Sequence, residues 1–138
     1  MNPSELRTRV KRFAIRVVKF VRAFSRDIAT REIGYQLLKS GTGESANYHA
    51  ACRGRSRAEF IAKLGTVVEE ADETEHWLDV IKQSELASGA ELEWLTLEAA
   101  ELRAIFKKSL KTSRTNYELQ REERARRSAR SVKPRKNP

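Results

Sequence analysis

A seven-residue rhythm between Phe60 and Ile81 constrains the fold of this chain more than any other feature. Apolar or small residues recur there at alternating spacings of four and three, at Phe60, Leu64, Val67, Ala71, Thr74, Leu78 and Ile81. A stripe with this spacing lies along one face of an α-helix. Ser56 stands three residues before Glu59, which is the capping-box pattern of a helix start. The segment therefore predicts a long amphipathic helix with one buried face.

Three other segments show the same helical periodicity. A first helix is predicted from about residue 4 to residue 25, with the stripe Leu6, Val10, Phe13, Val17, Val21 and Phe24. A second starts near residue 29, with Ile33, Leu37, Gly41, Tyr48 and Ala51 inward. A fourth opens at a second capping pattern, Ser88 to Glu91 around Gly89, and its stripe is Leu92, Leu95, Ala99, Leu102, Phe106 and Leu110. Four such helices with short connections predict an all-α, up-down-up-down bundle over residues 1–113.

The second helix contains two features that need a structural explanation. Gly41 and Gly43 lie in its interior, where glycine costs about 1 kcal/mol relative to alanine, so they predict a kink or the close approach of a neighbouring backbone. Glu44 falls on the inward stripe between Gly41 and Tyr48. Because a buried carboxylate needs a partner, we predict that Glu44 reaches an arginine of this chain or of a neighbouring subunit.

Composition places the chain among polar, strongly basic proteins. The 138 residues include 34% charged residues and carry a formal net charge of +9. Residues 114–138 contain few apolar side chains and are predicted to form a basic tail that is frayed helix or disordered. No apolar run approaches the about 18 residues that span a bilayer, and the lone Cys52 fits a reducing cytoplasm. We therefore expect a cytoplasmic protein without a membrane partner.

The basic residues are unevenly distributed. Residues 1–26 contain eight basic residues against one acid, whereas residues 57–83 contain three against seven. On a helical wheel, six cations of the first helix lie opposite its apolar stripe and form a basic ridge, namely Arg9, Arg12, Arg16, Lys19, Arg22 and Arg26. Such a ridge suits the phosphate backbone of RNA or DNA. The alternatives are an ordinary solvated face, or pairing with the acidic third helix or with acids of another subunit.

Two further clusters extend the predicted nucleic-acid-binding surface. The tail contributes Arg124, Arg126, Arg127 and Arg130, which have few acids nearby and do not flank a predicted hydrophobic core. Arg53, Arg55 and Arg57 stand at the junction of the second and third helices, beside the amides of a helix N-terminus. The alternative for this junction is structural, with Arg55 and Arg57 flanking the cap and pairing with Glu59 or Asp27.

Catalytic and metal-binding patterns are weak. His49 and Cys52 share a helical face, but a closed zinc site needs four ligands and no second pair is suitably spaced. Glu73 and His76 form one E-x-x-H pattern, and a di-iron bundle needs two. Ser40, Thr42 and Ser45 lack a neighbouring histidine base. We therefore expect no cofactor, no metal and no enzymatic activity.

Apolar side chains outside the main stripes point to self-association. Four such residues of the third and fourth helices are candidates for a subunit interface, Trp77, Trp94, Leu97 and Ile105. The alternative is that the two tryptophans cap the ends of the bundle.

The order of motifs from Ile33 to Trp77 resembles one protein family. The resemblance rests on Ile33-Gly34, Gln36-Leu37-Leu38, Ser40-Gly41-Thr42, Ala46-Asn47-Tyr48, Arg55-Ser56, Glu59-Phe60, Lys63-Leu64, Glu70-Ala71-Asp72-Glu73 and Trp77-Leu78. These residues resemble the S23-like four-helix-bundle proteins of intervening sequences in bacterial 23S ribosomal RNA genes, over roughly residues 5 to 112.

The resemblance implies a four-helix bundle without a metal and without an agreed biochemical activity. It also implies a ring-like homopentamer, as in the related accessory proteins of diversity-generating retroelements, whose basic surfaces engage nucleic acid and a reverse transcriptase. The function expected from residues and resemblance together is a non-enzymatic, oligomeric protein that binds RNA or DNA. The alternative is a protein-interaction scaffold, or an accessory subunit of a reverse transcriptase or another nucleic-acid enzyme.

Overall fold

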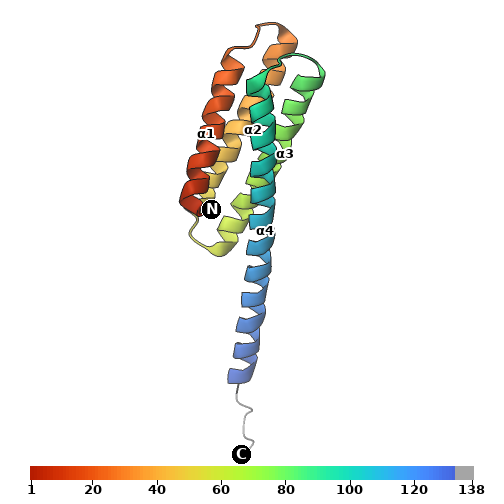
Figure 1. The fold of residues 1–138 in the computed structure, drawn as a ribbon. Helices are drawn as coiled ribbons and strands as arrows, with labels where there is room; N and C mark the ends of the chain where they lie inside the picture. The colour runs from red at the N-terminus through yellow and green to blue at the C-terminus, as the bar shows by residue number, and fades with distance from the viewer. Residues whose placement is uncertain (133–138) are drawn as a thin grey trace, which may run out of the picture.

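The computed structural model describes residues 1–132, and their architecture is four α-helices joined by short loops (Figure 1). The helices are α1 (Pro3–Arg22), α2 (Ile28–Cys52), α3 (Arg57–Gln83) and α4 (Ala90–Ser131). Each packs on its neighbour along the chain, and α1 also contacts α4. The predicted all-α, up-down-up-down bundle is therefore confirmed.

The four predicted stripes meet in one hydrophobic core. Its fully buried side chains come from every helix and include Val10, Phe13, Leu37, Leu64, Leu95, Leu102 and Phe106. Burying a side chain of this size stabilises the fold by about 1.5–3 kcal/mol, so the hydrophobic effect holds the bundle together. The contact between α1 and α4 is the least extensive of the four, and polar side chains cross it.

Three of the four helix starts have a side-chain cap. Asn2 and Glu5 form a capping box at α1, and Asp27 accepts from the Thr30 amide at α2. Ser56 accepts from the Glu59 amide at 3.1 Å, which confirms the start predicted for α3. The capping pattern predicted at Ser88 is wrong, since the N-cap of α4 is Gly89 without a side-chain bond.

The glycines of α2 permit close approach and do not interrupt the helix. A Cβ on Gly41 would stand 3.1 Å from Cγ1 of Val17, so the absence of a side chain lets α1 pack directly on α2. A Cβ on Gly43 would stand 3.1 Å from the carboxyl carbon of Glu70, so this glycine leaves room for a carboxyl group of α3. α2 is continuous through both positions.

The segment predicted as a frayed or disordered tail is helical as far as Ser131. Leu110 is the last buried residue of α4 and Tyr117 the last half-buried one. Beyond them α4 projects past the end of the bundle as an arm, defined here as residues 118–131 (Figure 1). The final tail residues, 133–138, lie outside the described part. Within residues 1–132, none of the helices combines the length and the apolar character that a bilayer crossing requires.

Candidate nucleic-acid interface

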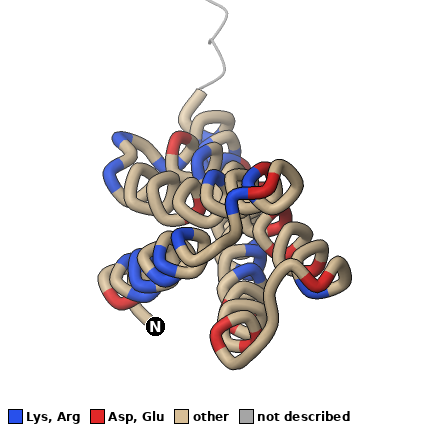
Figure 2. The backbone as a smooth tube through the Cα atoms, turned by 90° about the horizontal axis from the view of Figure 1, so that it is seen from above, with Lys and Arg blue, Asp and Glu red and all other residues tan. Residues whose placement is uncertain are grey.

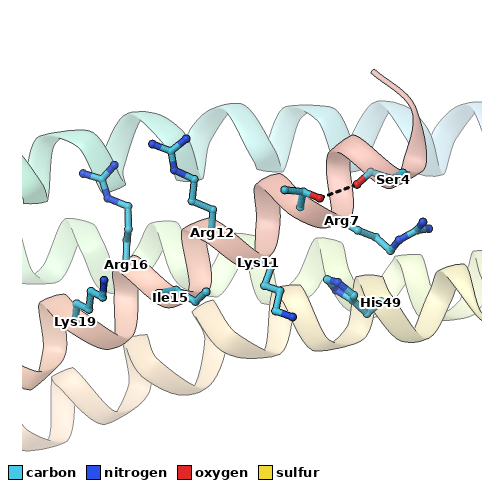
Figure 3. Close-up of a pocket in the computed structure, with 9 residues that line it drawn as sticks. Ser4, Arg7, Lys11, Arg12, Ile15, Arg16, Lys19 and His49 are labelled. Carbon is cyan, nitrogen blue, oxygen red and sulfur yellow. Dashed lines mark hydrogen bonds between the residues drawn. The ribbon is translucent and has the colours of Figure 1, made fainter.

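A basic groove runs along the outer face of α1. It has a volume of about 560 Å³ and is lined by Ser4, Arg7, Thr8, Lys11, Arg12, Ile15, Arg16, Lys19 and, from α2, His49. Five of these residues are cations and none is an acid. Figure 3 shows Arg12 and Arg16 projecting toward α4, and Lys11 projecting toward α2. Seen along the bundle axis, Figure 2 shows basic residues recurring along α1, which begins at the marked N-terminus.

Two members of the predicted ridge are not free to bind a ligand. The Arg9 guanidinium bonds the carboxylate of Glu98 and lies 3.1 Å from that of Glu101. Arg16 donates to both carboxylate oxygens of Glu91, at 2.9 and 2.6 Å, and its guanidinium lies 3.5 Å above the Trp94 ring. The hydrogen bond from Arg16 lowers the pKa of Glu91. Both arginines therefore connect α1 to α4, and the prediction of one continuous ridge is wrong.

The remaining ridge residues divide between two grooves. Arg12 and Lys19 line the α1 groove. Arg22 and Arg26 line a separate groove of about 480 Å³ at the junction of α1 and α2, together with Arg31. All four are exposed, and none forms an ion pair with another residue between 1 and 132.

Sequence reasoning missed Arg7 and Lys11, which contribute two of the five cations of the α1 groove. They stand four residues apart and so lie on one side of the helix, next to α2 rather than α4. The i, i+4 spacing was the available signal.

The three arginines of the α2–α3 junction are exposed at one end of the bundle. The backbone amide of Arg55 donates to the Glu59 carboxylate at 3.0 Å, and Glu59 also pairs with Lys63 at 3.4 Å. The predicted alternative, side-chain pairing with Glu59 or Asp27, does not occur. Glu59 bonds the Arg55 backbone and Lys63 instead, and Asp27 caps α2 at the opposite end of the bundle (Figure 1). The guanidinium groups of Arg53, Arg55 and Arg57 have no ion pair in the part of the chain that the structure describes.

The arginines of the arm fall into two groups. Arg126 and Arg127 pair within the helix with Glu122 and Glu123, at 3.6 and 2.6 Å. Arg124 and Arg130 are exposed and form no ion pair with the other described residues.

Two acids of α3, Asp72 and Glu75, pair with cations of α4. Arg103 bonds Asp72 and lies 3.0 Å from Glu75, and Lys107 lies 3.6 Å from Asp72. The alternative in which α1 pairs with the acidic third helix is therefore not realised in the chain itself, because the acids that α1 contacts belong to α4.

The four candidate interface residues occupy different environments. Trp77, Trp94 and Ile105 are half-buried and pack against the core, and Trp94 is also covered by Arg16. Leu97 is 73% exposed and lines a groove of about 640 Å³ at the α3–α4 turn. Of the four, Leu97 alone presents most of its side chain to solvent.

A pair of carboxyl groups interrupts the core between α2 and α3. Glu44 is fully buried, and neither of its carboxylate oxygens has a hydrogen-bond partner among the described residues. Burial, reinforced by the nearby charge of Glu70, raises the pKa of Glu44 to about 8. Burial likewise raises the pKa of Glu70. The arginine partner predicted for Glu44 is not present, and full burial excludes direct contact with another subunit.

Potential metal ligands do not gather in the described chain. No group of three or more His, Cys, Asp and Glu side chains with a metal-binding arrangement occurs within residues 1–132. In the pair His49 and Cys52, His49 directs Nδ1 to the Ser45 carbonyl oxygen at 2.9 Å, and Cys52 is a half-buried free thiol.

Fold and surface together define a small four-helix-bundle protein with an open basic groove. The model of the 23S rRNA-intervening sequence protein family matches residues 4–108, and the chain belongs to this family. A crystal structure described as a protein of unknown function from the S23 ribosomal protein family of Bacteroides thetaiotaomicron is similar, with a TM-score of 0.73. It is 28% identical in sequence, and the match covers 80% of this chain and 99% of that one. No curated protein matches the chain.

Proposed function

We propose that this protein is a non-enzymatic, cytoplasmic nucleic-acid-binding protein that neutralises the phosphates of RNA or DNA. The observation that carries the proposal is the α1 groove, which no acid lines. Four of its five cations form no ion pair with another residue between 1 and 132, namely Arg7, Lys11, Arg12 and Lys19. A protein that neutralises several phosphates releases condensed counterions, and this release drives binding without base readout. Tyr35 is the only aromatic residue among the large apolar side chains exposed in residues 1–132, so base stacking contributes little.

An oligomer would strengthen this binding, because several copies of a basic chain would present several grooves to one nucleic acid. The proposed state is a homo-oligomer, and the family resemblance favours a pentamer. The exposed Leu97 supports a contact between copies at the α3–α4 end of the bundle.

The test measures binding of a fluorescent structured RNA and a matched DNA duplex across a salt series. For the full chain we expect affinity to fall steeply with salt. Lys11→Ala/Arg12→Ala removes two groove cations and should reduce the salt slope on duplex DNA by about 2. The matched control, Lys39→Ala/Lys82→Ala, removes the same charge from exposed positions outside this groove and should change the slope much less. No binding to either nucleic acid at low salt would refute the proposal.

A second candidate function is a protein-interaction scaffold or an accessory subunit of a nucleic-acid enzyme such as a reverse transcriptase. The groove beside Leu97 favours it, because this groove joins an exposed leucine to small residues of the α3–α4 turn. Absence of RNA and DNA binding in the salt series would promote this candidate.

A further inference from the structure

The arm of α4 carries cations on the face that continues the core stripe of the helix. In the bundle this stripe includes Leu102, Phe106 and Leu110. Continued at the same helical spacing, it passes through Tyr117, Arg121, Arg124 and Ser128. The Arg121 guanidinium lies 5.9 Å from the Tyr117 ring centre, which fits their shared face. The side of α4 that is apolar inside the bundle thus becomes basic beyond it.

The acids of this region lie on other sides of the helix. Glu118, Glu122 and Glu123 are offset from the stripe, and two of them hold Arg126 and Arg127 in i, i+4 pairs. Arg126 lies on the opposite side of the helix and Arg127 at the edge of the stripe, and both are paired, whereas Arg121 and Arg124 retain their charge for a ligand. They have no ion pair with any residue from 1 to 132.

A second basic wall stands at the base of the arm. The α2–α3 junction closes the end of the bundle from which α4 projects (Figure 1), and it carries the exposed Arg53, Arg55 and Arg57. The stripe of α4 faces the bundle axis, so its continuation faces the space beyond this end. Arm and bundle end therefore form a corner with basic residues on both walls.

The arm is poorly suited to pair with a copy of itself. A coiled coil needs apolar residues at both stripe positions of each heptad, and here these positions hold Arg121, Arg124 and Ser128. Leu119 is 57% exposed but lies away from the stripe. The charge of the corner instead matches a polyanion.

We propose that this corner binds duplex DNA, with the arm in the major groove and the junction arginines on the flanking backbone. This inference rests on the proposed function. An α-helix with its side chains is about 10–12 Å wide, and the major groove of B-DNA is about 12 Å wide. The arm is about 21 Å long, which is shorter than one turn of the duplex at about 34 Å, so a straight helix fits. The major groove of A-form RNA is deep and narrow and excludes such a helix.

The test compares the full chain with two double variants on a DNA duplex and on an RNA duplex of the same sequence. Arg121→Ala/Arg124→Ala removes the stripe cations and should weaken DNA binding about tenfold, with little effect on RNA. The matched control is Arg126→Ala/Arg130→Ala, which removes equal charge from the opposite side of the same helix and should weaken binding clearly less. Circular dichroism of each variant checks that the arm stays helical.

A third variant and a modified DNA complete the design. Arg53→Ala/Arg55→Ala should weaken DNA binding as the stripe variant does, and glucosylated hydroxymethylcytosine, which fills the major groove, should do the same. Equal losses for the stripe and control variants, equal binding of DNA and RNA, or indifference to the glucosylated DNA would overturn the proposal. If both duplexes bind and only Lys11→Ala/Arg12→Ala weakens them, the corner fails and the proposed function stands. If neither duplex binds, both fail.

Discussion

The guanidinium of Arg16 lies 3.5 Å above the ring of Trp94 while it donates two hydrogen bonds to Glu91. One side chain of α1 thereby holds both an aromatic ring and a carboxylate of α4. A planar guanidinium suits this arrangement, because it stacks with its face and donates with its edge. The arrangement lies where α1 and α4 make the least extensive contact of the bundle. Arg16 is therefore a structural residue at the edge of the basic groove.

Arg16→Ala should lower the urea midpoint of unfolding, because it uncovers Trp94 and leaves Glu91 without its partner. Arg16→Lys should recover little of the loss, since an ammonium group cannot stack and donate twice at once. Arg12→Ala, four residues away and without an ion pair in the described chain, is the matched control and should leave the midpoint nearly unchanged. Equal effects of Arg12→Ala and Arg16→Ala would show that the contact does not stabilise the bundle.

The sequence predicted the helices well because each stripe is a local pattern. The seven-residue rhythm and the Ser56 cap of α3 both appear in the structure. The Ser88 cap is not formed because α4 begins one residue later, at the N-cap Gly89, whose φ of 107° suits glycine. The Glu91 side chain bonds Arg16, a residue 75 positions away. Contacts with α4 also explain why the helical wheel of α1 wrongly predicted one continuous ridge. Arg9 and Arg16 directly precede the buried Val10 and Val17, so they lie at the edge of the core, within reach of acids that no single-helix pattern reveals.

The arm was underestimated for a different reason. Residues beyond Tyr117 bury no face, and burial was the criterion by which the tail was predicted to fray. A helix that already exists adds residues without a new nucleation step, and Arg, Glu, Leu and Ala are strong helix formers. The i, i+4 pairs from Glu122 and Glu123 add to this local stability.

Glu44 should make the stability of the bundle fall as pH rises. Its pKa is about 8 in the folded state against an ordinary 4.5, so between these values the folded protein holds a proton that the unfolded chain has released. Each pKa unit corresponds to about 1.4 kcal/mol. The loss of folding stability caused by Glu44 therefore grows to a few kcal/mol near pH 8 and then levels off. Urea unfolding at pH 5 to 9 should therefore show that the free energy of unfolding of Glu44→Gln increases relative to that of the parent protein as pH rises. A constant difference between the two would contradict this prediction.

Glu69→Gln serves as the control for that series. Glu69 is exposed on α3, so its replacement should give a difference from the parent protein that changes little with pH. Glu44→Val tests separately whether the fold requires a partner for the Glu44 carboxyl group. Because Glu44 has no hydrogen-bond partner among residues 1–132, an apolar side chain of smaller size should be tolerated, with an unchanged or higher melting temperature at pH 8.

Gly41→Ala and Gly65→Ala should shift stability in opposite directions. Both glycines lie inside helices, where alanine gains about 0.5–1 kcal/mol. At Gly65 the nearest atom to a new Cβ is Nη2 of Arg114, at 4.0 Å, on a flexible side chain, so the gain should appear in full. At Gly41 the new Cβ meets the fully buried Val17, and overpacking of about 1–3 kcal/mol outweighs the gain. Urea titrations of the two variants measure this, and a stabilising Gly41→Ala would mean that α1 moves away freely.

Leu97→Glu should dissociate the proposed oligomer without unfolding the bundle. Leu97 is 73% exposed, so the change costs the monomer little, whereas a charge at the centre of an apolar contact between copies would prevent its burial. Trp77→Ala should instead destabilise the monomer, because its ring packs against the core. Light scattering after size-exclusion chromatography reports the mass, and circular dichroism reports the fold. An oligomer of unchanged mass in Leu97→Glu would move the contact between copies away from the α3–α4 turn. The basic α1 face would then be the next surface to test, because the acids on α3 that it would meet in a neighbouring copy include the exposed Glu69 and Glu73.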